Sequence, residues 1–346
     1  MKFEIAGVPI GLSHRPFIIA EMSGNHNHSL ERAFAIVDAA VETGAQAIKL
    51  QTYTADTITM KGVHTISEKS SLWYGKELHQ LYKDAYTPWE WHKPIMDYAK
   101  KKGIICFSSP FDETAVDFLE ELNVPAYKIA SFENTHHPLL KKVARTGKPV
   151  IMSTGVASID DIQESIEVLR SAGCKQLVIL KCTSTYPASP ENTNILTIPD
   201  MRKRFGIEVG LSDHTMGIGV SIGAVALGAV VIEKHFTLSR ADGGVDSAFS
   251  MEPHEMKSLV EESERVWLAL GKVSYELTEA EKPSLQYKRS IYVSGDIKAG
   301  EVFTGNNLKV IRPANGLHPR YFEQIIGKKA KKDIASGTPL QADMVE

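Results

Sequence analysis

The chain has 346 residues, of which 43% are hydrophobic and 23% are charged, as in an ordinary globular protein. Its formal net charge of −3 provides no global basic field, so we expect no nucleic-acid partner. No apolar run approaches the roughly 20 residues that cross a bilayer, and the start of the chain lacks an apolar signal core, so we expect no membrane partner. Three cysteines without a CxxC spacing indicate buried free thiols and a cytoplasmic protein.

Short apolar runs alternate with segments of helical periodicity along residues 1–271. The predicted strands are 16–22, 47–50, 104–107, 126–130, 149–152, 176–181, 207–211 and 229–232. The predicted helices are 29–44, 88–102, 112–122, 137–146, 158–172, 219–228 and 252–270. This alternation predicts a (β/α)8 barrel. A doubly wound open sheet is the alternative, but no GxGxxG follows the first strand.

One connection and the C-terminal part of the chain do not follow this alternation of strands and helices. Residues 52–87 are rich in Tyr, Trp, Ser and His and are predicted to form a long loop that acts as a lid or binding loop. Residues 272–288 read as a linker, and 289–346 as a small domain of short strands and glycine turns. In that domain GDIKAGEVFTGNNL and KDIASGTPLQADMV resemble each other as an internal repeat. Because roughly 60 residues form a marginal core, we expect this domain to dock on a barrel rim.

Polar side chains gather where the predicted strands end. In a parallel barrel these ends meet at one rim, where such barrels place their chemistry. The strand ends deliver Glu21, Lys49, Ser108, Ser109, Lys128, Ser131, Ser153, Thr154, Ser184, Ser212, His214, Glu233 and His235. Inward-facing lysines are costly unless they meet an anion, so Lys49 and Lys128 suit a phosphate or a carboxylate. The alternative is that each lysine pairs with Glu21 or Glu233 as a structural ion pair.

His214 and His235 end neighbouring predicted strands and are expected to emerge side by side. Two histidines are only part of a metal shell, because zinc sites need three or four protein ligands. Completed by water and substrate oxygens, the pair suits an octahedral divalent ion, with Mn²⁺ favoured and Mg²⁺ or Co²⁺ as alternatives. Glu21 is a further candidate ligand, directly or through water. The alternative is two hydrogen-bonded histidines that cap their strands.

Seven phrases in register give the chain a family resemblance. IIAEMSGNHN, IKLQTY, YKIAS, PVIMSTG, KCTSTYP, GLSDHT and IEKHFT, in this order, resemble the N-acetylneuraminate synthase family. IKAGEVFTGNNLKVIRPANG resembles the C-terminal SAF (antifreeze-protein-like) domain of that family. Within the family, EMSGNHN in place of EAGVNHNG, and Ser184 where neuraminate synthases usually carry Asn, resemble the pseudaminic acid synthase branch.

The resemblance implies condensation of phosphoenolpyruvate with 2,4-diacetamido-2,4,6-trideoxy-L-altrose, with C–O cleavage and release of phosphate. An N-acetylneuraminate or legionaminic acid synthase, with a different acceptor sugar, is the alternative within the family. It further implies that phosphoenolpyruvate is bound by Lys49, Ser109, Lys128, Ser131, Ser153 and Ser212. His214 and His235 would bind Mn²⁺ as a Lewis acid, and Glu21 would steer water or a proton.

The resemblance also implies an acceptor site and an assembly. The acceptor sugar would meet Glu233, Ser184 and Tyr186. Arg312, in the phrase RPANG, would contact the acceptor's N-acyl group from the SAF domain of a partner chain, which implies a domain-swapped homodimer. Two other functions remain open from the residues: a Schiff-base aldolase with Lys128 or Lys49 as nucleophile, and a sugar-binding module without catalysis.

Overall fold

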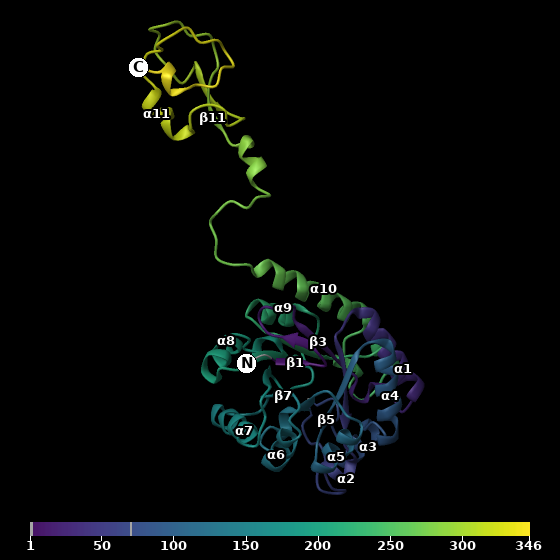
Figure 1. Cartoon of the computed structure of the whole chain (residues 1–346). Coiled ribbons are helices and arrows are strands. Elements are labelled where there is room, and N and C mark those ends of the chain that lie inside the picture. Colours follow the sequence, from purple (N-terminus) through teal and green to yellow (C-terminus); the bar gives the residue numbers. More distant parts are fainter. Residues whose placement is uncertain (1–2, 70) are drawn as a thin grey trace. The chain divides into compact units, whose positions relative to one another are not determined.

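The computed structural model describes residues 3–69 and 71–346. The chain divides into two compact units, Met1–Gly271 and Lys272–Glu346, which are described separately (Figure 1).

The first unit is built on a closed barrel of eight parallel strands. They are β3 (Phe17–Glu21), β4 (Ala47–Thr52), β5 (Ile105–Pro110), β6 (Tyr127–Ile129), β7 (Val150–Ser153), β8 (Leu177–Cys182), β9 (Glu208–Ser212) and β10 (Val231–His235). Each pairs with the next, and β10 closes the barrel on β3. The predicted (β/α)8 barrel is confirmed, and each predicted strand overlaps an observed one.

Helices surround the strands (Figure 1). They are α1 (Leu30–Thr43), α4 (Trp89–Lys102), α5 (Glu113–Glu121), α6 (His137–Arg145), α7 (Ile159–Ser171), α8 (Thr197–Phe205), α9 (Gly219–Ala226) and α10 (Pro253–Leu270). Their ends follow local chemistry: the Ser29 side chain accepts the Arg32 N–H at 3.1 Å to begin α1, and Gly44 ends it at φ 82°. Helix α8 was not predicted from the sequence.

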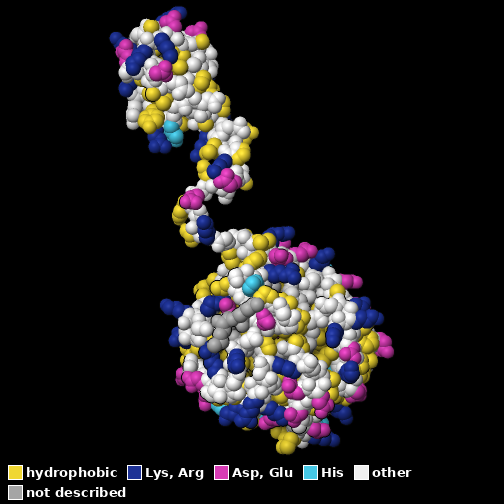
Figure 2. Space-filling model, in the orientation of Figure 1, with side chains coloured by type: hydrophobic (Ala, Val, Ile, Leu, Met, Phe, Trp, Pro, Cys, Tyr) yellow, Lys and Arg dark blue, Asp and Glu magenta, His cyan; other side chains and the backbone are white. Residues whose placement is uncertain are grey.

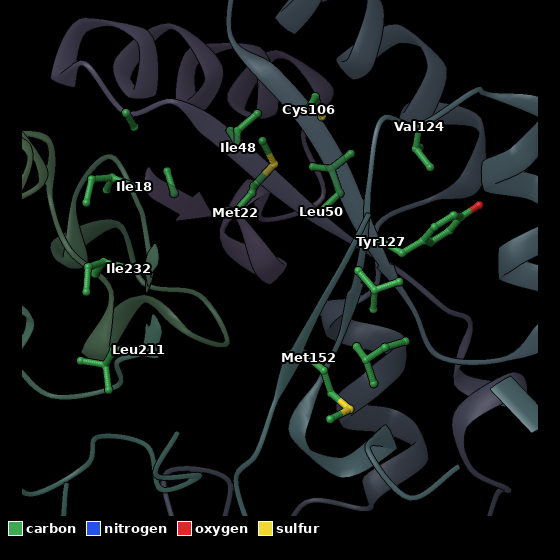
Figure 3. Close-up of a cluster of buried hydrophobic side chains, with 14 of the residues drawn as sticks. Ile18, Met22, Ile48, Leu50, Cys106, Val124, Tyr127, Met152, Leu211 and Ile232 are labelled. Atoms are coloured by element: carbon green, nitrogen blue, oxygen red, sulfur yellow. The ribbon is translucent and has the colours of Figure 1, made fainter. Parts of the chain in front are cut away.

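Alternation along the strands separates two buried clusters. Outward-facing residues such as Ile18, Ile48 and Leu211 pack beneath the helices (Figure 3). Inward-facing residues form the cluster inside the barrel, which comprises Phe17, Ile19, Ala47, Phe107, Ile151, Val178, Leu180 and Val231. In the strands that contribute to it, this inner cluster lies before the last inward-facing position, which is free to carry a polar group.

Two segments of the first unit differ from their prediction. An antiparallel hairpin of β1 (Phe3–Ile5) and β2 (Val8–Ile10) was not predicted, and three of its apolar side chains join the inner cluster. Strands of three residues are too short to show a period of two. The segment 52–87, predicted as a long loop, also contains two helices, α2 (Ala55–Ile58) and α3 (Leu78–Ala85). In α3 the apolar residues Leu78, Leu81, Tyr82 and Ala85 recur at helical spacing, so the sequence pattern could have identified this helix.

The second unit has its own small core. Strands β11 (Ser290–Val293) and β12 (Leu308–Ile311) pair antiparallel, and a short helix α11 (Phe322–Ile325) follows. The two similar phrases face each other: Ile297 and Ile334 exchange backbone hydrogen bonds of 2.9 and 2.8 Å. Both isoleucines lie in this unit's buried cluster. The segment predicted as a linker includes a 3₁₀ helix, Lys282–Tyr287.

Surface charge and helix hydropathy are the two properties that relate to nucleic-acid and membrane partners. On the face of the first unit drawn in Figure 2, Lys and Arg side chains intermingle with Asp and Glu side chains. Within residues 3–69 and 71–346, the helices are all too short or too polar to cross a bilayer.

Candidate active site

The inner face of the barrel changes from apolar to polar toward the C-terminal ends of the strands. In β9 and β10, Ser212 is in register with Glu233, and both side chains face inward. Lys49 follows the inward-facing Ala47 at a spacing of two in β4. The same alternation brings Glu21, Lys49, Ser109, Lys128, Ser153, Ser212 and Glu233 together at one rim, all buried.

Two lysines and two glutamates form a charge cluster at the centre of this rim. Lys49 Nζ lies 2.6 Å from Glu21 Oε2 and 3.6 Å from Glu233 Oε1. Lys128 Nζ also lies 3.6 Å from Glu233 Oε1, which is too far for a hydrogen bond. The ion pair that the sequence left as an alternative therefore forms at Lys49, whereas Lys128 has the looser carboxylate contact.

The predicted serines surround these charges. Lys49 Nζ donates to Ser109 Oγ at 3.1 Å, and Lys128 Nζ donates to Ser153 Oγ at 2.6 Å. Ser212 Oγ donates to Glu233 Oε1 at 3.3 Å. Ser131 Oγ, just after β6, accepts the Gly155 N–H at 3.2 Å. The hydroxyls and ammonium groups thus form a compact set of hydrogen-bond donors suited to an anion.

Burial and mutual charge set the protonation of the cluster. Burial raises the pKa of Glu21 despite the opposing effect of Lys49. For Glu233, burial is outweighed by Lys128 and Lys49, so its pKa is lowered and the carboxylate is charged. Burial lowers the pKa of Lys128, which makes this amine the more easily deprotonated of the two lysines.

His214 and His235 stand next to each other, as predicted. Their ring centroids are 5.5 Å apart at an interplanar angle of 61°. His214 Nδ1 lies 3.0 Å from the Thr183 carbonyl oxygen, which fixes the ring and leaves its other nitrogen available. His235 Nδ1 is buried without a hydrogen-bond partner. Burial holds the pKa of His235 well below its usual range, so the ring is neutral, the form that binds metals.

The histidine pair is not part of a larger protein ligand set. Within the described residues, 3–69 and 71–346, His, Cys, Asp and Glu side chains form no group of three or more that could hold a metal ion. The two imidazoles therefore form what we call a half shell, a partial set of metal ligands that water and substrate oxygens would complete. They do not form the closed four-ligand cage of structural zinc. The unpartnered His235 Nδ1 is the atom that fits a bound ion.

A cavity of about 390 Å³ lies over the rim. Its polar lining consists of Ser23, Gln51, Ser131, Ser184, Tyr186, His235 and Asp246. Its apolar lining includes Tyr53, Ile66, Trp73, Leu78, Leu81, Tyr82, Phe111 and Phe132. Most of this apolar wall comes from residues 53–85, and Trp73 Nε1 donates to the Val245 carbonyl at 3.1 Å. The segment predicted as a loop therefore contributes to the binding cavity through its helices and aromatic side chains.

Several residues of the site were not predicted. Gln51 Nε2 donates to Glu21 Oε1 at 3.1 Å, and its spacing of two from Lys49 could have identified it. Glu133 is buried with Oε2 unpartnered, and burial raises its pKa to about 7. Asp246 is buried and accepts a hydrogen bond from Ser23 Oγ. Glu133 ends a 3₁₀ helix of three residues, Ser131–Glu133, and Asp246 lies in a loop; neither segment carries a periodic signal.

The remaining predicted residues fall in two places. Ser184 and Tyr186 line the cavity, and the Tyr186 ring lies 4.4 Å from the His214 ring between centroids. Arg312 belongs to the second unit, where it is exposed directly after β12. Its contact with an acceptor sugar therefore stays a prediction.

Buried lysines, carboxylates and histidines in the rim cavity of a (β/α)8 barrel define an enzyme of the barrel class that acts on a small molecule. Comparison with known proteins sharpens this class. Residues 36–275 match the NeuB family and residues 288–346 match the SAF domain. The chain belongs to the NeuB family.

Individual relatives cover nearly the whole chain. A pseudaminic acid synthase from Campylobacter jejuni is 43% identical over 94% of this chain and 95% of its own length. A pseudaminic acid synthase from Helicobacter pylori is 41% identical over 96% of this chain and 98% of its own. The solved N-acetylneuraminic acid synthetase of Leptospira borgpetersenii is 32% identical, with a TM-score of 0.73 over 83% of this chain and 96% of that one.

These findings confirm the family that the sequence predicted, together with its barrel and SAF domain. The relatives are named synthases, so the chain is an enzyme, a transferase of this family. The alternative of a sugar-binding module without catalysis is therefore wrong.

Proposed function

We propose that this enzyme condenses phosphoenolpyruvate with 2,4-diacetamido-2,4,6-trideoxy-L-altrose to give pseudaminic acid and phosphate. The observation that carries the proposal is the rim itself, where two buried lysines and their serines lie beneath a cavity with one polar and one apolar side. The names of two relatives, both pseudaminic acid synthases, support the same product.

Phosphoenolpyruvate is assigned to the lysine and serine cluster. Its carboxylate and phosphate are compact anions, and ammonium groups and hydroxyls are suitable donors for them. Lys128 is the stronger candidate, because its only carboxylate contact within the cluster is the loose one to Glu233 at 3.6 Å. Ser109, Ser131, Ser153 and Ser212 supply the surrounding hydroxyls.

A divalent metal ion, Mn²⁺ in the first place and Mg²⁺ or Co²⁺ as alternatives, is assigned to His214 and His235. The buried, unpartnered and neutral His235 ring supports this assignment, as does the adjacent His214 ring. When bound, the ion supplies Lewis acidity at the acceptor's aldehyde oxygen.

The reaction forms one bond, breaks another and needs groups that move water and protons. Carbon 3 of phosphoenolpyruvate forms a bond to the aldehyde carbon, and the resulting cation at carbon 2 is captured by water. Breakage of the C–O bond to phosphate leaves the 2-keto acid. Glu21, which lies against Lys49, is placed to steer the water or a proton. Glu133, with a pKa of about 7, is a second group suited to moving a proton near neutral pH.

The acceptor sugar is assigned to the cavity above the cluster. A diacetamido-trideoxy hexose carries two acetyl groups and a methyl carbon, and the apolar wall from residues 53–85 suits these methyl groups. Glu233, Ser184 and Tyr186 face its polar groups. A Cβ at Gly155 would collide with Ser184 Oγ and Ser131 Oγ, so glycine there leaves the space that both hydroxyls use.

A domain-swapped homodimer in the cytoplasm completes the proposal, with Arg312 reaching the acceptor's N-acyl group in the partner's barrel. The three cysteines are buried free thiols, which suits a reducing compartment.

Product mass spectrometry on a panel of acceptor sugars tests the function. With Mn²⁺ and phosphoenolpyruvate, the diacetamido-trideoxy altrose is expected to give the nine-carbon acid and an equal amount of phosphate. Turnover of N-acetylmannosamine instead would make the enzyme an N-acetylneuraminate synthase, and turnover of the legionaminic acid precursor would make it a legionaminic acid synthase. No turnover of any diacetamido-trideoxy hexose would contradict the proposed branch.

One observation favours a second mechanism. The lowered pKa of Lys128 is also a property of Schiff-base lysines. Borohydride reduction during turnover distinguishes the two: the proposed mechanism leaves no reduced adduct on the protein, whereas a Schiff-base aldolase leaves one on Lys128 or Lys49.

A further inference from the structure

A second charged pair lies directly behind the two histidines. Lys234 Nζ donates to Asp213 Oδ2 at 3.0 Å, and the two side chains are 1% and 0% exposed. Asp213 immediately precedes His214, and Lys234 immediately precedes His235. Because strand residues alternate between faces, this pair lies on the outer side of the barrel wall when the histidines lie on the inner side.

The strand register supports this placement. Ser212 and Glu233 are aligned and face inward, and Asp213 N–H continues the ladder by donating to the Glu233 carbonyl at 2.9 Å. One step earlier on the same strands, the outward positions hold Leu211 and Ile232, which are buried beneath the helices. The outward layer of these two strands thus changes from apolar to charged only beside the histidines.

Both members of the pair are also tied to the segment after His214. Asp213 Oδ1 accepts Thr215 N–H and Thr215 Oγ1, each at 2.8 Å, and Oδ2 accepts Ser221 Oγ at 2.6 Å. Lys234 Nζ donates to the carbonyls of Thr215 at 2.6 Å and Gly217 at 2.9 Å. All three ammonium hydrogens therefore have acceptors, and the lysine ties β10 to the chain that leaves β9.

We propose that the Asp213–Lys234 pair is a brace that sets the separation of His214 and His235, and so the affinity of the half shell for its metal ion. The inference rests on the metal assignment in the proposed function. Asp213 and Lys234 lie on the outer side of the barrel wall, opposite the face that carries the histidines. They act as positioning residues, through the backbone on which the rings are mounted.

A purely structural role explains the pair less well. Replacement of a buried ion pair by apolar residues is often neutral or stabilising, so a barrel gains little fold stability from charges here. A fully hydrogen-bonded pair does fix geometry, because each of its contacts is directional. Groups that support metal ligands from behind typically change metal affinity by about 10- to 100-fold when altered.

Direct Mn²⁺ binding tests the brace without relying on turnover. The free aqua-ion signal in electron paramagnetic resonance is measured during titration of the full-length enzyme with MnCl₂. The variant Asp213→Asn/Lys234→Met removes both charges at nearly constant volume. We expect its Mn²⁺ dissociation constant to rise about 10-fold or more. Its KM for phosphoenolpyruvate, measured at saturating Mn²⁺, should stay within about twofold of the wild type, because the lysine and serine cluster is untouched.

Two further variants complete the experiment. Arg202→Met/Glu208→Gln removes the ion pair, 3.0 Å long, that α8 makes with the opposite end of β9, and it should leave Mn²⁺ affinity unchanged. Ser221→Ala removes only the hydrogen bond that Ser221 Oγ donates to Asp213 Oδ2, and it should weaken Mn²⁺ binding by a few-fold. It decides the question if the double variant at the brace does not fold.

The outcomes separate the brace from the metal assignment. The brace would be overturned, and the metal assignment left intact, if a folded Asp213→Asn/Lys234→Met variant bound Mn²⁺ with wild-type affinity. If the double variant does not fold, wild-type affinity in Ser221→Ala would have the same meaning. Absence of Mn²⁺ binding in the wild type, or binding that His235→Gln does not change, would overturn the metal assignment and with it the brace.

Discussion

Glu133 offers a prediction in which stability and activity change in opposite directions. Its side chain is buried, its Oε2 has no hydrogen-bond partner, and burial raises its pKa from 4.5 to about 7. Between these two values the folded protein holds a proton that the unfolded chain has released. Folding stability therefore falls as pH rises from about 4.5 to 7, and the loss is complete above that range.

The size of this loss follows from the pKa difference. A rise of about 2.5 pKa units at about 1.4 kcal/mol each makes the ionised Glu133 cost about 3.5 kcal/mol of stability at pH 8. The variant Glu133→Gln cannot ionise, so it should be about 3.5 kcal/mol more stable than the wild type at pH 8. At pH 4 the two proteins should differ little.

Urea unfolding followed by tryptophan fluorescence measures this difference in the barrel alone. The four tryptophans, Trp73, Trp89, Trp91 and Trp267, all lie in the first unit, so the second unit contributes no signal. Phosphate release by the same variant should fall by about 100-fold or more, because a proton-transfer group has been removed. A stability difference that is equal at pH 4 and pH 8 would refute the reasoning, as would full activity of the variant.

Three further perturbations test the assigned roles. Lys128→Met should raise KM for phosphoenolpyruvate about 10- to 100-fold in steady-state assays, because a charge-assisted hydrogen bond contributes roughly 1.5–3 kcal/mol. The control variant Lys181→Met, on the outer side of β8, should leave this KM unchanged. An unchanged KM in Lys128→Met would argue against the phosphoenolpyruvate site. EDTA should abolish turnover and added Mn²⁺ should restore it in the wild type but not in His235→Gln; activity that survives EDTA would contradict the metal assignment. Leu81→Ser should lower the kcat/KM preference for a 6-deoxy over a 6-hydroxy acceptor by several-fold, and an unchanged preference would remove the apolar wall from acceptor recognition.

The sequence predicted the barrel and its polar rim because both depend on local patterns. Apolar runs of four to six residues and well-capped helices such as α1 repeat along the chain, and strand alternation carries Lys49 and Glu233 to the inner face. Once the strands close into a barrel, these side chains have to meet at one rim.

The parts that the sequence did not predict depend on long-range contacts. Asp246, which lines the cavity from a loop, and Glu133, which ends a three-residue 3₁₀ helix after β6, become buried only when the chain folds. The strands of the hairpin β1–β2 have three residues each, which is too short for a clear period, and the hairpin packs its apolar side chains into the inner cluster. Ionic partners such as Lys234 for Asp213 are 21 residues apart and become neighbours only through the parallel register.

The most direct test of the central claim uses phosphoenolpyruvate labelled with ¹⁸O at the oxygen that bridges carbon 2 and phosphorus. The enzyme is incubated with this substrate, Mn²⁺ and the diacetamido-trideoxy altrose, and both products are analysed by mass spectrometry. We expect an unlabelled nine-carbon acid at the mass of pseudaminic acid, and phosphate that carries the label. Label retained in the sugar acid, or absence of the nine-carbon product, would contradict this expectation.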